Sequence, residues 1–279
     1  MKKTKNLILF VSMLFLLVSC KKSSPTKKTD EQTLTQASVN LGTHQLAAYT
    51  LIRQSKYLVV FESGLGDGHD VWNQKNVISS IAATSDVLSY DRAGYGKSTL
   101  GPKPRNISTL SAELAKLIEQ FANHSKVILV GHSLGGMVIR DYAIKNPDKV
   151  AALLFIDPSH EYYNRPSTTD QEQIYNEFKN AYGANFGGAL EASCLIEDSN
   201  YTATLPNLPH VPVTVISSTK TDALHSTADR KKWFDAHELL KAGVNDFTHI
   251  ATANAGHYIM VDEPNLVVDS FKALLKKLP

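Results

Sequence analysis

Val127-Ile-Leu-Val130 runs directly into Gly131-His132-Ser133-Leu134-Gly135-Gly136, and this stretch decides the fold of the 279-residue chain. The apolar tetrapeptide predicts a strand that is covered on both faces. Two of the glycines leave room for a tight turn, and the segment from Leu134 to Lys145 predicts a helix after it. We therefore expect a serine at the apex of a strained turn between a strand and a helix.

Short apolar runs alternate with helix-like stretches from residue 37 onward, which is typical of a mostly parallel sheet covered by helices on both faces. Strands are expected at 57–61, 86–90, 126–130, 150–156, 211–217 and 247–253, after a hairpin over 39–53. Helices are expected at 70–83, 107–121, 134–145, 228–241 and 264–277. Ser108 is the predicted N-cap of the second of these helices.

The segment 158–210 interrupts this alternation with about fifty residues between two strands, and a structureless loop of that length is unusual in a compact domain. We interpret it as a small, mostly helical cap, inserted before the strand that precedes Asp222 and lying over one end of the sheet. It is rich in tyrosine and phenylalanine. These aromatic residues either line a substrate pocket or attach the cap to the body, and the sequence leaves both alternatives open.

The N-terminal segment 1–20 has a basic start and a short apolar run, which is typical of a signal peptide that is excluded from the fold. Its end, Leu17-Val-Ser-Cys20, resembles the bacterial lipobox, in which the cysteine is lipidated. Residues 21–36 have the composition of a flexible tether. We expect an exported protein of the bacterial cell envelope, anchored to a membrane through lipid on Cys20; the alternatives are an ordinary cleaved signal peptide and an uncleaved anchor.

The net charge is +2, but seven lysines lie at or before Lys28, so the remainder is mildly acidic. This balance gives no general basic face and argues against a nucleic-acid partner. Besides Cys20 the chain has only Cys194, so the domain cannot form an internal disulfide.

Ser133 needs a base within hydrogen-bond reach, because a neutral hydroxyl is a poor nucleophile. His257 is the preferred base, since it follows the last predicted strand and a loop there can deliver its side chain above the sheet edge to which the serine turn points. His249 lies within that strand, and His132 is expected to pack beside the nucleophile.

The base in turn needs a carboxylate that orients it. Asp222 follows the strand at 211–217, and Asp157 ends the strand at 150–156. Both lie between serine and histidine in the chain, so their order does not choose between them. Asp222 is our first choice and Asp157 the alternative acid, with Asp229 a further candidate.

A tetrahedral intermediate also needs two backbone donors for its oxyanion. The residue after the nucleophile, Leu134, supplies one N–H group. Ser63-Gly-Leu-Gly-Asp-Gly68 follows an early strand and has the glycines that let a backbone turn inward. By position, the N–H of Leu65 is the expected second donor.

Taken together, the motifs resemble those of the α/β-hydrolase superfamily: Phe61-Glu-Ser-Gly-Leu-Gly66, Ser89-Tyr-Asp-Arg-Ala-Gly-Tyr-Gly-Lys-Ser98, the serine turn, Phe155-Ile-Asp-Pro158 and Gly256-His257. The resemblance implies an α/β-hydrolase domain over 37–279, with the cap at 158–210. In that family the Asp91-Arg92 segment is structural and supports the floor of the site. Two departures are Ser63-Gly64, where many relatives have His-Gly, and Ser218-Thr-Lys-Thr-Asp222, which lacks a common glycine.

The predicted function is hydrolysis of a small-molecule ester through an acyl-enzyme on Ser133, with amides and thioesters as secondary substrates. No metal and no cofactor are implied. Two alternatives remain: a non-catalytic ligand-binding lipoprotein that keeps the fold, and a lipase that acts on membrane lipid.

Overall fold

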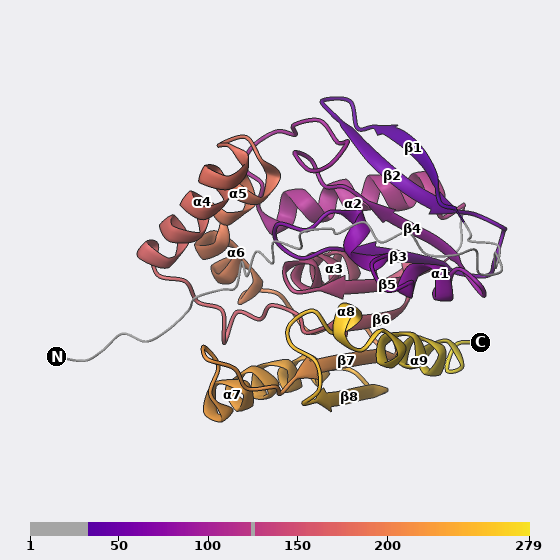
Figure 1. The fold of residues 1–279 in the computed structure, drawn as a ribbon. Coiled ribbons are helices and arrows are strands. Elements are labelled where there is room, and N and C mark those ends of the chain that lie inside the picture. Colours follow the sequence, from indigo (N-terminus) through magenta and orange to yellow (C-terminus); the bar gives the residue numbers. More distant parts are fainter. Residues whose placement is uncertain (1–32, 124–125) are drawn as a thin grey trace, which may run out of the picture.

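The computed structural model describes residues 33–123 and 126–279 (Figure 1). The predicted signal peptide, the lipidation site Cys20 and most of the predicted tether lie outside the described residues.

An eight-stranded sheet forms the centre of the described chain, with the strand order β1-β2-β4-β3-β5-β6-β7-β8. β2 pairs antiparallel with both β1 and β4, and every other neighbouring pair is parallel. The strands are β1 (Thr35–Asn40), β2 (Gln45–Leu51), β3 (Leu58–Glu62), β4 (Asp86–Tyr90), β5 (Val127–His132), β6 (Val150–Ile156), β7 (Val213–Ser218) and β8 (Phe247–Thr252). The predicted mostly parallel sheet is therefore confirmed.

Helices cover both faces of the sheet, as predicted. Side chains of α2 (Ile107–Phe121) and α3 (Leu134–Lys145) belong to one core cluster. Side chains of α1 (Val77–Ile81), α8 (Ile259–Asp262) and α9 (Pro264–Leu275) belong to a second. Successive strand residues alternate between the two clusters because strand side chains point to opposite faces in turn. The remaining elements are η1 (His69–Trp72), η2 (Pro147–Lys149), α7 (Thr227–Glu238) and η3 (Leu239–Lys241).

The segment between β6 and β7 contains three helices, α4 (Thr168–Tyr182), α5 (Gly187–Ala192) and α6 (Leu195–Thr202). They lie together beyond one end of the sheet, at the left of Figure 1. Phe178 is buried inside this cap, and Phe186 packs edge-on against Tyr95 of the body with ring centroids 4.8 Å apart. These two aromatic residues therefore attach the cap and stabilise it.

Two local expectations are wrong. The helix predicted over 70–83 is divided into η1 and α1, because Asn76 takes the left-handed conformation with φ 59° and ends the regular repeat. The N-cap of α2 is Asn106 rather than Ser108; its backbone is extended and its side chain accepts a hydrogen bond from the N–H of Thr109. Within the part of the chain that the structure describes, no helix combines the length and apolar character needed to cross a bilayer.

Candidate active site

Ser133 stands at the turn between β5 and α3, with φ 51° and ψ −122°. A non-glycine residue at positive φ is strained and persists only where its surroundings enforce it. The neighbours do so by close packing: a Cβ on Gly135 would lie 2.3 Å from the carbonyl oxygen of Glu62, and one on Gly131 would lie 2.8 Å from the carbonyl oxygen of Gly135. The turn thus has the strained geometry of a nucleophile elbow.

His257 lies in the loop after β8 and donates from Nδ1 to Oδ2 of Asp157 at 2.7 Å. Its backbone carbonyl accepts a hydrogen bond of 3.0 Å from Nε2 of His132, and the two rings lie 4.6 Å apart. This contact holds the His257 loop against the residue that precedes Ser133. Burial lowers the pKa of His132 to about 3, so this ring is neutral and serves as a packing and hydrogen-bonding group.

Asp157 follows β6 directly, is completely buried and has φ 42°. Its Oδ1 accepts two hydrogen bonds, from the N–H of Ser218 at 2.8 Å and from Nε1 of Trp233 at 2.6 Å. Burial opposes ionisation, but the hydrogen bond and charge of His257 outweigh it and lower the pKa of the Asp157 carboxyl. Asp157 is therefore an ionised acceptor that fixes the ring of His257.

Asp222 does not take this place, which corrects our first choice of acid. Its side chain is 42% exposed and faces the loop after β7, where it bonds His225 at 2.9 Å and Arg230 at 3.3 Å. Some burial opposes ionisation, but the hydrogen bonds from His225 predominate and lower its pKa to about 2. Asp229 is also placed elsewhere, in a capping box with Ser226 at the start of α7.

The two residues predicted to supply the oxyanion donors lie together beside Ser133. Leu65 follows β3, Leu134 is the first residue of α3, and both line the same pocket as Ser133. The close approach of Gly135 to Glu62 brings the two segments together. The N–H of Leu134 has no intrahelical partner, because it belongs to the first turn of a helix.

Trp233 contacts both Asp157 and His257, and sequence reasoning missed it. It lies on α7, donates to Asp157 and packs edge-on against His257 with centroids 6.3 Å apart. The sequence around Trp233 carries no recognisable motif. Had Asp157 been the preferred acid, a hydrogen-bond donor to it would have been sought on this helix.

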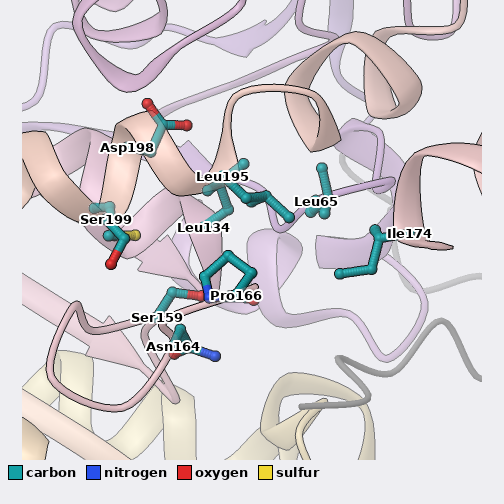
Figure 2. A pocket seen from close by; sticks show the side chains of 11 residues that line it. Leu65, Leu134, Ser159, Asn164, Pro166, Ile174, Leu195, Asp198 and Ser199 are labelled. Carbon is teal, nitrogen blue, oxygen red and sulfur yellow. The ribbon is translucent and has the colours of Figure 1, made fainter. Parts of the chain in front are cut away.

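The pocket at Ser133 lies between the sheet end and the cap, with a cavity of about 30 Å³. Figure 2 shows Leu65 and Ile174 on one side of it and Ser199 on the other. Within the described residues the hydroxyl of Ser133 makes no hydrogen bond, so it is free to meet a ligand there.

The lining residues are Leu65, Ser133, Leu134, Met137, Ser159, Asn164, Pro166, Ile174, Leu195, Asp198 and Ser199. No tyrosine or phenylalanine is among them, so of the two alternatives for the cap aromatics the structure favours attachment.

In the described part of the chain, no group of three or more histidine, cysteine, aspartate or glutamate side chains is arranged to hold a metal ion.

Asp198 on α6 gives the pocket wall a pH-dependent contribution to stability. Its Oδ1 accepts from the N–H of Ile107, whereas Oδ2 is buried without a hydrogen-bond partner among the described residues. Burial raises the pKa of Asp198 to about 8. Because the folded state holds this proton more tightly than the unfolded state, the contribution is complete below about pH 4 and is lost as the pH rises toward 8.

We expect wild type to lose at least about 1 kcal/mol more of its unfolding free energy between pH 5 and pH 8 than Asp198→Asn does. Urea unfolding of both proteins at the two pH values measures this difference. If the difference in unfolding free energy between wild type and Asp198→Asn is the same at pH 5 and pH 8, the raised pKa of Asp198 is contradicted.

Comparisons with known proteins agree with this architecture. The family model described as the alpha/beta hydrolase fold matches residues 57–186. Abhydrolase domain-containing protein abhd-5.2 of Caenorhabditis elegans is 33% identical over 137 residues, which cover 48% of this chain and only 29% of that protein. Protein YqjL of Bacillus subtilis is 24% identical over 213 residues, which cover 75% of this chain and 79% of that protein. A thermophilic esterase of Thermogutta terrifontis superposes with a TM-score of 0.68 at 17% identity, over 87% of this chain and 98% of that one.

The sheet order, the strained serine turn and these similarities lead to one conclusion. The chain has the alpha/beta hydrolase fold.

Proposed function

We propose that this protein hydrolyses small carboxylic esters through an acyl-enzyme on Ser133. The observation that carries the proposal is the Asp157–His257 hydrogen bond beside a strained serine whose hydroxyl opens into a pocket. Because Nδ1 of His257 donates to Asp157, its Nε2 is left as the proton acceptor for the serine hydroxyl. The alpha/beta hydrolase fold and the hydrolase names among the relatives support an enzyme of this general kind.

The proposed reaction has two balanced halves. Oγ of Ser133 attacks the ester carbonyl while His257 accepts the hydroxyl proton, and the N–H groups of Leu65 and Leu134 stabilise the oxyanion. The carbon–oxygen bond to the alcohol then breaks, and His257 returns the proton to the departing alcohol. A water molecule attacks the acyl-enzyme in the same way, which releases the carboxylic acid and restores Ser133. Amides and thioesters could pass through the same steps.

A fluorophosphonate probe tests the proposal, because it phosphonylates a serine only when that serine is activated. Intact protein should incorporate one label, and Ser133→Ala should incorporate none. If the intact protein is folded but takes up no label that depends on Ser133, the chain is a binding protein that keeps the fold, and the proposal is wrong.

The small cavity leads us to expect a preference for short acyl groups. A cavity of about 30 Å³ has room for about two water-sized groups. We expect kcat/KM for nitrophenyl acetate or butyrate to exceed that for the laurate ester by at least about tenfold, since a longer chain must displace packed cap side chains. Steady-state hydrolysis of the ester series measures this preference.

Ile174→Ala is the matched variant for this series, because Ile174 reaches the pocket from α4 of the cap. Removing three side-chain carbons should shift the optimum toward longer acyl groups while leaving acetate hydrolysis within a few-fold of wild type. A wild-type preference for laurate or palmitate would favour the membrane-lipid lipase instead.

Export and membrane anchoring belong to the proposal and rest on the sequence alone. The support is the basic start, the short apolar run and the Leu17-Val-Ser-Cys20 tetrapeptide. We propose that lipid on Cys20 holds the domain at a membrane of the bacterial cell envelope through the tether at 21–36.

A further inference from the structure

Arg92 follows β4, is 2% exposed and uses all five of its N–H donors. Nε and Nη2 donate to the two carboxylate oxygens of Glu191 at 2.7 and 2.9 Å. Nη1 donates to Oε1 of Glu62 at 2.9 Å and to the carbonyl of Ser63 at 2.7 Å. The second hydrogen of Nη2 goes to the carbonyl of Gly64 at 2.7 Å. The guanidinium thus joins a carboxylate of the cap to the backbone of the loop after β3.

The contact with Gly64 acts on the oxyanion donor directly. The carbonyl of Gly64 and the N–H of Leu65 belong to one peptide group, and in a planar trans peptide the two point in opposite directions. A donor that fixes the carbonyl therefore also fixes the direction of the N–H. A charged donor on the carbonyl in addition polarises the peptide and strengthens its N–H as a donor.

The peptide group on the other side of Leu65 is fixed as well. The N–H of Gly66 donates to the hydroxyl of Tyr95 at 3.1 Å, and this hydroxyl donates to Oε2 of Glu191 at 2.6 Å. Tyr95 is 2% exposed. Both peptide groups that flank Leu65 are therefore held by side chains that share one acceptor, Glu191.

Glu191 belongs to α5 of the cap and is completely buried. The cap packs closely against the body here. The N–H of Gly187 donates to the carbonyl of Gly94 at 3.0 Å. A Cβ on Gly94 would lie 2.8 Å from the nitrogen of Gly187, and one on Gly187 would lie 2.3 Å from the ring of Tyr95. The carboxylate of Glu191 reaches Arg92 and Tyr95 only when α5 is seated in this way.

We propose that Glu191 is a positioning residue: by holding Arg92 and Tyr95 on either side of Leu65, it makes the oxyanion donor of Leu65 depend on the seating of the cap. The inference rests on the proposed ester hydrolysis. Glu191 touches no substrate and acts through the two side chains that it holds. Its removal leaves the His257–Asp157 hydrogen bond in place and loosens the donor that faces the developing charge.

The experiment compares Glu191→Gln and Tyr95→Phe with wild type in ester hydrolysis and in inhibition by a trifluoromethyl ketone. This ketone adds to an activated serine and places an alkoxide in the oxyanion hole. Loss of a whole oxyanion donor costs about 10²- to 10³-fold in kcat, so we expect a misdirected donor to cost about 10- to 100-fold in Glu191→Gln. KM should stay within about twofold, and the inhibition constant of the ketone should rise by the same factor as kcat falls.

Glu113→Gln is the matched control. Glu113 is a buried carboxylate of α2 that binds Arg105 through both oxygens, at 2.5 and 2.7 Å, and its polar partners in the described structure, Arg105 and His44, do not belong to the loop of Leu65. We expect it to lower the Tm much as Glu191→Gln does, while kcat and the ketone inhibition constant remain those of wild type.

Tyr95→Phe removes a single hydroxyl, so it keeps the test decisive if Glu191→Gln does not fold. A parallel loss of kcat and ketone affinity in Tyr95→Phe supports the inference. The inference is overturned if wild type takes up the fluorophosphonate at Ser133 but both variants, when folded, keep the kcat and the ketone inhibition constant of wild type. In that case the role of Glu191 is only structural. If wild type takes up no label, the proposed function fails first and the inference fails with it.

Discussion

Replacing Asp157 with asparagine is expected to lower kcat for a nitrophenyl ester by about four orders of magnitude. Oδ1 of Asp157 accepts from Ser218 and Trp233, so the amide oxygen of the new side chain must occupy that position. The amide NH₂ group then faces Nδ1 of His257 as a donor. Nδ1 must become the acceptor, the proton moves to Nε2, and His257 can no longer take the proton of Ser133.

Asp222→Asn is the control for this result. Asp222 is exposed, and among the described residues its bonds lie within the loop after β7 and to Arg230 of α7. Its replacement should change kcat and KM by no more than about twofold, because exposed ion pairs contribute little. Steady-state kinetics of both variants decide between the two acids. A large loss in Asp222→Asn together with full activity in Asp157→Asn would reverse the assignment.

Replacing Ser133 with alanine is expected to have the largest effect, a loss of kcat of about 10⁶-fold. The reason is that no acyl-enzyme can form, and only oxyanion stabilisation and substrate binding remain. KM should stay within a few-fold, because the pocket walls are unchanged. The residual rate of a highly purified variant with a nitrophenyl ester measures the loss.

Ser217→Ala is the control, because the hydroxyl of Ser217 hydrogen-bonds to two histidines in the described structure. Ser217 is completely buried between His237 and His249, at 2.5 and 2.6 Å. A substrate cannot reach it, so this variant should lose stability but keep kcat within about fivefold. Loss of turnover in Ser217→Ala with turnover retained in Ser133→Ala would contradict the choice of nucleophile.

Most of the sheet could be predicted because its strands are short runs of β-branched and aliphatic residues bounded by helices or turns. The strand expected at 150–156 matches β6, and the helix at 107–121 matches α2. The nucleophile turn was also readable, since its glycines stand beside the serine in the sequence, although the contact that requires Gly135 comes from Glu62 of β3. These features are local, and local patterns report them well.

The acid could not be chosen in this way, because it depends on where two loops lead after their strands end. Asp157 follows the last residue of β6 and is held against the end of β7 by Ile216 and Ser218, whereas Asp222 lies beyond the end of β7 in a loop that folds onto α7. The missing glycine in Ser218-Thr-Lys-Thr-Asp222 was the one signal of this difference. Trp233 and Glu191 were missed for the same reason: each acts across a contact between segments distant in sequence.

Trapping the acyl-enzyme tests the central claim most directly. Wild type is mixed with a nitrophenyl ester, quenched in acid before the steady state, and its intact mass and peptides are measured. We expect one added acyl group, located on Ser133, that disappears in Ser133→Ala and forms far more slowly in Asp157→Asn. An acyl group on another residue, or turnover of the ester without any covalent adduct, would contradict the account.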